Sequence, residues 1–407
     1  MSRLDSIAIV GGGPAGALAG ALLAAQGRLV ALFDEKLVWE KPCGGGVTYK
    51  ALEEYPFLAD AGRESNPVED CELISPSGRR AHFRVQHPVA IFSRLTLNGL
   101  LLERARQAGV DVRHERVTCI ESLSPDGGNS GNWQLTTPHG EYRAGYLILA
   151  AGARNQFRAQ FLSPMLSDDL MVTAGYFIPG RSSRMQIQFL QGLTGYIWVF
   201  PRTDHFSAGI ACKMGETPTA ELRRLLERWL QQNGFSVEGA QFYSHILPSF
   251  RTQTFAALKA CGEGWAMIGD TAGLVDPITG EGLYYALRSA ELCAKALLEG
   301  RPDTYQGALQ EDVIAELKLA ASVSERFYQG QIFGESVLER MVLLTAQNAG
   351  VRRLMSDLFA GIQGYRDLRS RLYRILPSLM AEGIADSIRK PWTRDNPSRF
   401  ARDPLAE

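Results

Sequence analysis

A glycine-rich segment near the N-terminus contains residue types that can hold a phosphate group. Residues 11–16 read Gly-Gly-Gly-Pro-Ala-Gly, which satisfies the spacing GxGxxG. Glycines at these positions allow a tight turn and a close approach of the backbone to a pyrophosphate, and the N-terminus of a following helix faces that negative charge. A carboxylate 18 residues after the last glycine can bind a ribose hydroxyl. The contacts predicted for this part of the cofactor are Gly11, Gly13, Pro14, Ala15, Gly16, Asp34 and Glu35.

The elements around this segment are those of a dinucleotide-binding unit. Residues 7–10 form a fully apolar run typical of a central parallel strand, 17–26 are rich in Ala and Leu like a helix, and 29–33 form a second apolar strand. If the second strand continues, Glu35 points to the face opposite Asp34, so Asp34 is the preferred ribose ligand. The alternative is a glycine-rich turn that only packs a helix on a strand.

A second glycine cluster lies far along the chain. Residues 265–268 form a strand-like apolar run that ends in Gly269 and Asp270, and a Gly-Glu-Gly triplet then opens a helix predicted over 280–298. An NAD site needs no second element of this kind. FAD is longer and needs one for its ribityl chain and isoalloxazine ring, so the two clusters together predict FAD.

At this point the sequence resembles the flavoprotein monooxygenase superfamily typified by para-hydroxybenzoate hydroxylase. The resemblance implies that the carboxylate of Asp270 binds the ribityl chain. It also implies that the following helix directs its N-terminus at the flavin pyrimidine, where the helix dipole would stabilise the anionic reduced flavin. Arg94, at the start of a leucine-rich helix, matches the arginine that this superfamily places beside the cofactor; the alternative is an exposed charge in the first turn. The cofactor contacts implied here are Arg94, Gly269, Asp270, Gly280 and Gly282.

Two further motifs narrow the resemblance. Residues 41–46 read Lys-Pro-Cys-Gly-Gly-Gly, and 196–201 read Tyr-Ile-Trp-Val-Phe-Pro, with three aromatic residues on one face of a strand. Together they resemble the geranylgeranyl reductase family over roughly residues 5–300, although 209–211 read Gly-Ile-Ala where that family has Gly-x-Gly. The resemblance implies cofactor contacts at Cys43, Gly44 and Gly45, and an isoprenoid cavity lined by Tyr196, Trp198 and Phe200.

The implied function is an FAD-dependent reduction of isolated double bonds in a prenyl, geranylgeranyl-type chain carried by a lipid, a quinone or a chlorophyll-type molecule. An isolated alkene has no carbonyl to accept negative charge. A proton must therefore be delivered before or together with the hydride of the reduced flavin. Cys43 and Tyr196 are the candidate catalytic residues, as thiol and phenol proton sources. The plainer interpretations are that Cys43 is a structural buried thiol and that the aromatic residues are ordinary sheet core.

These elements predict an α/β fold, in which a Rossmann-like FAD-binding domain carries an inserted antiparallel-sheet substrate domain and a helical C-terminal region. Residues Thr217 and Pro218 are predicted to cap and to begin a helix within the sheet region, and a turn is predicted at 126–129. The predicted boundaries are 1–65, 90–165 and 255–300 for the discontinuous FAD-binding domain, 66–89 and 166–254 for the substrate-binding sheet, and 301–407 for the helical region.

The composition is that of a globular protein. The 407 residues are 45% hydrophobic and 21% charged, with a net charge of −1, which excludes a disordered chain and a strongly basic nucleic-acid binder. No apolar window is long enough to span a membrane, no histidine or cysteine spacing suggests a metal site, and six sparse cysteines favour free thiols in a cytoplasmic protein. Residues 351–407 carry 11 Lys and Arg against 7 Asp and Glu, so this tail could rest on anionic lipid headgroups; a solvated, salt-bridged surface is the alternative.

Two other functions fit the same residues. Flavin-dependent monooxygenases and halogenases belong to the same superfamily, and halogenases have a similar Trp-x-Trp-x-Ile-Pro motif. A halogenase also needs a catalytic lysine, for which Lys50 is the nearest candidate, although a helix-surface charge explains it more simply. The remaining alternative is a flavoprotein that binds an isoprenoid without turnover. The expected electron donor is NADPH or a ferredoxin-like protein, because one GxGxxG gives no dedicated NADPH domain.

Overall fold

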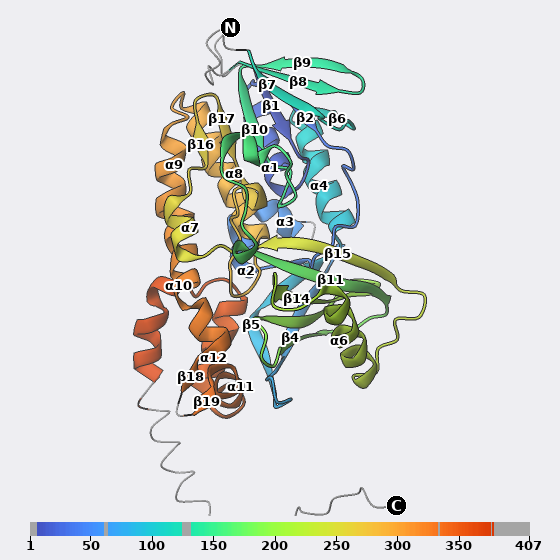
Figure 1. The fold of residues 1–407 in the computed structure, drawn as a ribbon, viewed down its shortest axis with the longest axis vertical. Coiled ribbons are helices and arrows are strands. Elements are labelled where there is room, and N and C mark those ends of the chain that lie inside the picture. The colour runs from blue at the N-terminus through green and yellow to red at the C-terminus, as the bar shows by residue number, and fades with distance from the viewer. Residues whose placement is uncertain (1–5, 61–63, 124–131, 333, 376, 378–407) are drawn as a thin grey trace, which may run out of the picture.

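Two large sheets and a group of C-terminal helices make up the architecture (Figure 1). The structure, a computed structural model, describes residues 6–60, 64–123, 132–332, 334–375 and 377. The turn predicted at 126–129 and the part of the basic tail beyond residue 377 lie outside the described residues. The predicted α/β fold is confirmed, whereas the domain boundaries stay a prediction.

The first sheet is the parallel core of the predicted dinucleotide-binding unit. Its strands β1 and β2 confirm the runs predicted at 7–10 and 29–33. The helix α1 (Pro14–Ala24) packs beside them and contacts both α4 (Arg94–Gln107) and α8 (Leu283–Leu298). The helix α1 begins at its proline because proline suits the first helical position. The strand order is β16 (Cys261–Gly262), β17 (Trp265–Met267), β10 (Tyr146–Leu149), β1 (Ser6–Val10), β2 (Leu29–Phe33) and β6 (Asp111–Arg113), with only β16 antiparallel to its neighbour.

Smaller elements surround this sheet. A three-stranded antiparallel sheet near the edge of the parallel one consists of β7 (Cys119–Ser122), β8 (Trp133–Thr137) and β9 (Gly140–Ala144) (Figure 1). The short helices are α2 (Tyr49–Glu54), α3 (Pro56–Asp60), α5 (Arg158–Phe161) and α7 (Thr252–Ala257), and single 3-10 turns lie at Ser167–Asp169 and Gly269–Thr271. These elements connect the strands without forming a layer of their own.

The second sheet has eight strands and is antiparallel except for one pair. The strands β12 and β4 run parallel, because the hairpin of β4 and β5 comes from an earlier part of the chain and joins the later strands beside β12. The prediction of an antiparallel sheet therefore holds apart from this pair. The strand order is β15 (Gln241–Pro248), β11 (Leu170–Pro179), β14 (His205–Lys213), β13 (Gly195–Pro201), β12 (Arg184–Phe189), β4 (Ser65–Ile74), β5 (Arg80–Phe92) and β3 (Gly46–Val47).

One face of the eight-stranded sheet packs against α6 (Thr219–Gln232). The helix buries Leu222, Leu226 and Leu230 in a shared hydrophobic cluster with the sheet. Its N-cap is Pro218, whose backbone is extended with ψ 143°. The predicted cap at Thr217 was therefore wrong by one residue, because a proline in the extended conformation precedes the helix instead of starting it.

The C-terminal region packs on the sheet at the lower end of the view in Figure 1. Two helices, α11 and α12, contact β5 and share a hydrophobic cluster with it. The predicted helical pattern is interrupted by a short hairpin, and a helical segment follows over 365–375. The elements are α9 (Thr304–Leu309), a π-helical turn (Gln310–Ile314), α10 (Ala315–Gln329), β18 (Gln331–Ile332), β19 (Glu335–Ser336), α11 (Val337–Gln347) and α12 (Ala349–Phe359).

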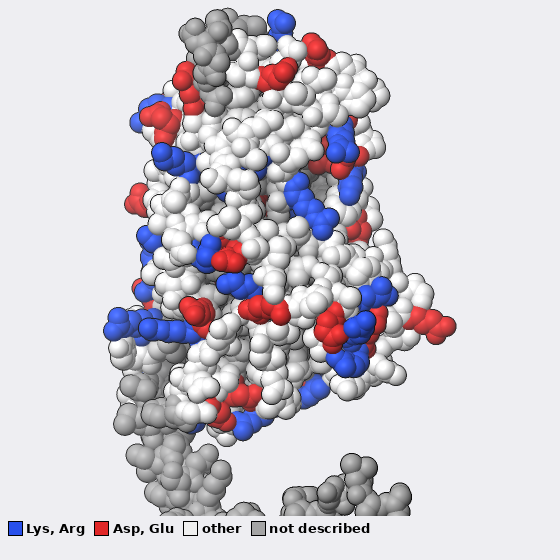
Figure 2. Space-filling view, in the orientation of Figure 1, with Lys and Arg blue, Asp and Glu red and all other residues white. Residues whose placement is uncertain are grey.

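The surface charges are mixed. Figure 2 shows Lys and Arg interspersed with Asp and Glu over the face in view, in keeping with the net charge of −1. No broad area of one sign, of the kind that binds nucleic acid through its phosphates, is seen on that face. Within the described residues, no helix is long and apolar enough to cross a membrane.

Candidate active site between the two sheets and the C-terminal helices

A large cavity connects the glycine segments to the C-terminal helices. Its volume is about 1840 Å³, whereas pockets for one ligand usually measure about 300–1,000 Å³. Residues of the glycine segments line one part, and the other part lies between the eight-stranded sheet and the helices α10 to α12. The space is therefore large enough for a cofactor and a long second ligand together.

The first glycine segment has the geometry of a phosphate cradle. Gly11 has φ 112°, and a Cβ there would lie 2.4 Å from the carbonyl oxygen of Ala150. A Cβ on Gly16 would lie 2.0 Å from the carbonyl oxygen of Gly11, so neither glycine can be replaced without moving the backbone. Gly13 is the N-cap of α1 and faces open space. The N-terminus of the helix is therefore accessible to an anion from the cavity.

Asp34 is tied to this cradle. Its Oδ2 accepts the backbone N–H of Gly12 at 2.7 Å, and its Oδ1 accepts the backbone N–H groups of Lys36 and Leu37 at 2.7 and 2.8 Å. Glu35, by contrast, is exposed and lies 3.6 Å from Arg116. Both acidic residues line the cavity, but only Asp34 fixes the glycine segment. Their predicted contacts with a ribose stay predictions.

The second glycine cluster brings a charged group to the same cavity. The carboxylate of Asp270 lies 3.2 Å from Nζ of Lys41. Burial raises the pKa of Asp270, but Lys41 and then Arg94 outweigh this effect and leave the pKa below its ordinary value. The side chain is therefore an anion that can accept hydrogen bonds from hydroxyl groups. Gly269, with φ 58°, packs its Cα against Ala15 and thus joins the two glycine clusters.

Arg94 is buried, with 3% of its surface exposed, and it lines the cavity. Its Nη2 donates to Oδ1 of Asn98 at 3.1 Å, one turn further along α4. The alternative interpretation of an exposed first-turn charge is therefore wrong. His245 on β15 also lines the cavity and was missed by the sequence analysis, since it belongs to no motif. Burial, followed by Lys41, lowers the pKa of His245 to about 3, so the imidazole is neutral.

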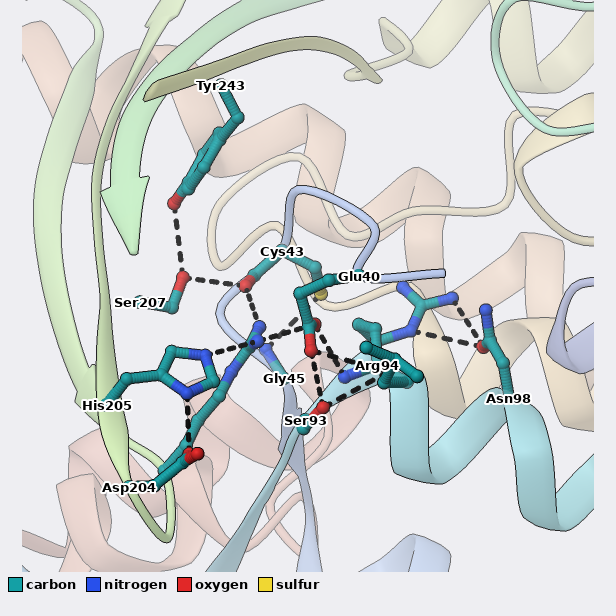
Figure 3. Close-up of polar contacts among 12 residues, drawn as sticks. Glu40, Cys43, Gly45, Ser93, Arg94, Asn98, Asp204, His205, Ser207 and Tyr243 are labelled. Atoms are coloured by element: carbon teal, nitrogen blue, oxygen red, sulfur yellow. Dashed lines mark hydrogen bonds and ion pairs between the residues drawn. The ribbon is translucent and has the colours of Figure 1, made fainter. Parts of the chain in front are cut away.

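The backbone of Cys43 is held from the eight-stranded sheet (Figure 3). Its carbonyl oxygen accepts hydrogen bonds from Nη2 of Arg202 and Oγ of Ser207, both at 2.7 Å. Its Sγ accepts the backbone N–H of Gly45 at 3.3 Å. The thiol also lines the cavity.

An ion pair fixes the same loop to the rest of the molecule. Arg202 is fully buried, and its Nη1 lies 2.5 Å from Oε1 of Glu40. Glu40 also accepts the backbone N–H of Arg94 at 2.8 Å and the hydroxyl of Ser93. The pair therefore connects the Cys43 loop, the start of α4 and β13 through one carboxylate. Sequence analysis missed both members, because nothing in their sequence neighbourhood distinguishes them from surface charges.

The two predicted motifs meet at Gly44. A Cβ on Gly44 would lie 2.7 Å from the ring of Phe200, so the ring lies directly against the glycine. Gly45 has φ 84°, and a Cβ there would lie 2.1 Å from the carbonyl oxygen of Phe92. The glycine run is thus required for the loop to fit between β5 and the aromatic strand.

The aromatic residues of β13 face the cavity. Tyr196, Trp198 and Phe200 all line it, whereas the alternate residues Ile197 and Val199 pack in the cluster beneath α6. The hydroxyl of Tyr196 donates to the carbonyl oxygen of Thr279 at 2.7 Å. Burial, with Asp276 and Cys43, raises the pKa of Tyr196, so the phenol stays protonated.

Trp198 explains why one glycine of the following strand is present. It pairs with Gly209 on β14, and a Cβ at that position would lie 2.2 Å from its ring. Ala211 occupies the position of the second glycine in the family pattern, and it pairs with Tyr196. Of these two positions, only the one beneath the Trp198 ring must therefore lack a side chain, because the ring covers the neighbouring backbone there.

The C-terminal helices line the apolar part of the cavity. Its wall on the helical side includes Phe327, Met341, Met355 and Phe359. Four hydrophobic residues that line this part are 39–46% exposed, and we call them the rim: Val323, Ile332, Ile362 and Leu372. Within the described residues, no group of three or more His, Cys, Asp or Glu side chains is arranged to hold a metal ion, and the six cysteines are free.

Comparisons with known proteins agree with this geometry. No protein-family model matches the chain. The chain is 24% identical over 322 residues to a geranylgeranyl diphosphate reductase of Synechocystis sp., covering 72% of this chain and 75% of that protein. It is 26% identical over 399 residues to a menaquinone reductase of Mycolicibacterium smegmatis, covering 88% and 93%.

Solved structures share the fold. A geranylgeranyl bacteriochlorophyll reductase-like protein from Thermoplasma acidophilum superposes with a TM-score of 0.75 at 19% identity, covering 91% of this chain and 95% of that one. A flavin-dependent brominase superposes with a TM-score of 0.67 at 16% identity, covering 92% and 99%. At such identities these likenesses concern the fold alone.

The fold and the relatives together define an oxidoreductase of the flavoprotein class. Within this class, the chain is a homologue of the geranylgeranyl reductases. The resemblance predicted from residues 41–46 and 196–201 is thereby confirmed.

Proposed function

We propose that the chain binds FAD and saturates isolated double bonds of a prenyl chain carried by a lipid, a quinone or a chlorophyll-type molecule. The observation that carries this proposal is the continuity of the cavity, which runs from the glycine clusters past Cys43 and Tyr196 into an apolar space. The names of the relatives support the substrate class, since geranylgeranyl diphosphate and menaquinone share a prenyl chain.

The residues that would hold FAD fit its chemistry from end to end. The open N-terminus of α1 suits the pyrophosphate, and Asp34 suits a ribose hydroxyl. The anionic Asp270 suits the ribityl hydroxyls, and the N-terminus of α8 behind Gly282 suits a developing negative charge on the flavin. Bound and reduced, FAD supplies the hydride of the reaction.

The chain's own residues position the second ligand. Trp198 and Phe200 offer a flat apolar wall, and the wall of the C-terminal helices excludes water from the opposite side. Of the two predicted proton sources, Tyr196 donates its hydroxyl proton to the carbonyl oxygen of Thr279, whereas the Sγ of Cys43 is an acceptor in its contact with Gly45. Tyr196 therefore positions the loop before α8, and Cys43 is the better placed of the two.

We also propose that the protein acts at the cytoplasmic surface of a membrane. The exposed rim at Val323, Ile332, Ile362 and Leu372 lines the apolar part of the cavity, so a lipid-borne chain could pass from the bilayer to the site without crossing water. Arg366, which lines the same cavity 3.7 Å from Glu316 and is largely exposed, suits anionic headgroups. NADPH or a ferredoxin-like protein would supply the electrons.

The proposed function is tested by anaerobic reduction of the FAD-loaded protein, followed by mass spectrometry of an added mixture of prenyl lipids. We expect a gain of two hydrogens for each double bond saturated. Incorporation of oxygen or halide on reoxidation would instead indicate a monooxygenase or halogenase. Lys50 also lines the cavity, but it is half-buried and engaged elsewhere, with its Nζ 4.0 Å from Glu54 and over the ring of Tyr284, so it gives that alternative little support. Prenyl binding without turnover would indicate the non-catalytic alternative.

A further inference from the structure

A carboxylate without an assigned role stands at the N-terminus of α8. Glu281 lies between Gly280 and Gly282 and lines the cavity. Its Oε1 accepts the backbone N–H of Tyr284 at 2.8 Å. Among the described residues, no side chain donates a hydrogen bond to its Oε2 and Glu281 forms no ion pair; the backbone N–H of Leu283 is the other donor near the carboxylate. One oxygen is therefore available to a molecule in the cavity.

A neighbouring carboxylate differs from Glu281 in this respect. Asp276 accepts the backbone N–H groups of Ile278 and Thr279 on Oδ1, at 2.8 and 3.2 Å, and the hydroxyl of Tyr365 on Oδ2 at 2.8 Å. Both of its oxygens are engaged in holding the loop before α8. Asp276 is thus a structural acid, and Glu281 is the one whose free oxygen borders the cavity.

The surroundings of Glu281 favour its neutral form. Burial raises the pKa of Glu281 to about 7; Asp276 and Asp270 add to this rise, and the backbone N–H groups of Tyr284 and Leu283 oppose it. An acid of this pKa holds its proton in about half of the molecules at neutral pH, which suits a group that must both give up and regain a proton.

Four titratable groups around Glu281 keep one charge state from about pH 6 to pH 9, and a fifth is an exception. Tyr196 on β13 and Tyr285 on α8 have raised pKa values because of burial, and they stay neutral. Asp270 stays anionic and His245 stays neutral. The exception is Asp276, whose pKa is also raised by burial; the variants below separate it from Glu281.

We propose that Glu281 is the proton donor of the reduction, an inference that rests on the proposed function. The carboxyl O–H bond breaks and a C–H bond forms at one alkene carbon. The other alkene carbon receives the hydride of the reduced flavin, which is thereby oxidised by two electrons. The resulting carboxylate lies beside the carbon on which positive charge develops and stabilises it electrostatically. Water then returns a proton to Glu281.

This assignment also makes prenyl binding dependent on pH. An apolar chain that covers Glu281 removes water from the carboxyl group, so it binds the neutral form better than the anion. Binding above the pKa of the free group must therefore take up one proton. The affinity is then constant below about pH 7 and falls about tenfold for each pH unit above it.

Binding is measured on the FAD-loaded protein with geranylgeraniol as the probe, by tryptophan fluorescence from pH 6 to pH 9. Above about pH 7 we expect the affinity of the wild type to fall about tenfold per pH unit. The affinity of Glu281→Gln should stay nearly constant over the same range, and that of Glu299→Gln should fall as in the wild type. Glu299 is a matched control, because it lies at the opposite end of α8 beside Arg301. A decline that persists in Glu281→Gln would overturn the proposal. No binding at any pH in any variant would instead count against the proposed function.

Turnover supplies the second measurement. We expect single-turnover reduction by the wild type to slow above pH 7 and Glu281→Gln to be about 10²–10⁴-fold slower, with unchanged flavin content. Glu281→Asp retains an acid and should recover part of the rate. This recovery would show that Glu281→Gln is slow because it lacks the carboxyl proton and not because it is misfolded. Wild-type rates in Glu281→Gln, together with loss of activity in Cys43→Ser, would overturn the assignment in favour of Cys43.

Discussion

The guanidinium of Arg202 and the carboxylate of Glu40 meet at 2.5 Å, with the arginine fully buried. Arg202 lies at the end of the aromatic strand region, and Glu40 precedes the glycine run that contains Cys43. The two motifs on which the proposed function depends are therefore held at a fixed distance by a contact that belongs to neither. The same guanidinium also donates through Nη2 to the carbonyl oxygen of Cys43, so one side chain holds both partners.

Replacing Arg202 by Met should destabilise the protein by about 3–5 kcal/mol, because it leaves the carboxylate of Glu40 and the carbonyl of Cys43 without their partner. The free energy of unfolding, from denaturant titration, measures the loss. Combining Arg202→Met with Glu40→Gln should recover part of it, since no charge is then left unpaired. Equal stability of the single variant and the wild type would contradict this role.

Replacing Gly44 by Ala should displace the ring of Phe200 and cost about 1–3 kcal/mol, because the new Cβ would lie 2.7 Å from that ring. The expected effect on function is weaker prenyl binding. Gly307→Ala on α9 is the control, since a Cβ there meets nothing within 4 Å. The measurements are the thermal unfolding temperature and the affinity for geranylgeraniol. Equal values in the two variants would argue against the close contact.

Asp34→Asn should lower the affinity for FAD about tenfold or more, because the amide cannot accept all three backbone N–H groups that the carboxylate accepts. Glu35→Gln should leave the affinity almost unchanged, since that side chain is exposed, pairs with Arg116 and does not hold the glycine segment. Fluorescence titration of the apoprotein with FAD gives both constants. The reverse order of effects would show that Glu35 is the ribose ligand.

Lys41→Met should make FAD binding sensitive to acid. Without the lysine, burial dominates and raises the pKa of Asp270. As the pH falls, Asp270 of the variant therefore becomes protonated at a higher pH than Asp270 of the wild type. The protonated form no longer accepts hydrogen bonds from the ribityl hydroxyls as the anion does. We expect the variant to release FAD between about pH 6 and pH 4, a range in which the wild type retains it. The measurement is flavin content after gel filtration at each pH, and identical profiles would remove Lys41 from this role.

Charges placed on the rim should weaken membrane association. Ile362→Glu combined with Leu372→Glu replaces two exposed hydrophobic residues that line the cavity. We expect less protein to sediment with liposomes that contain anionic lipid, and unchanged thermal stability. Deleting residues from 351 onward would not be a clean test, because α12 packs its Val351 and Met355 against the sheet. Undiminished sedimentation would place the membrane contact elsewhere.

The sequence was informative wherever a local rule applies. The runs around residues 11–16 predicted strand, turn and helix correctly, because apolar strands and glycine turns depend on neighbours in the chain. The period of two in residues 196–200 likewise placed three aromatic side chains on one face. Even the predicted helix start at Pro218 was wrong by only one residue.

Other parts of the site depend on contacts between distant segments. Arg202, Glu40 and His245 have no motif, and their roles follow only from burial and from partners far along the chain. Glu281 stands inside a recognised glycine triplet, but its free oxygen and raised pKa come from the packing around Asp276 and Asp270. A single sequence carries no signal for such long-range electrostatics.

The parallel pairing of β12 with β4 also has a consequence for synthesis of the chain. The β4–β5 hairpin is complete at Phe92, but β12 begins only at Arg184. At about 5–20 residues per second, a nascent chain holds this hairpin with one open edge for several seconds. An open strand edge attracts other chains, so the outer edge of β4 is a place where a nascent chain can pair wrongly until β12 is made. Substitutions that favour pairing at this edge should therefore increase aggregation during expression.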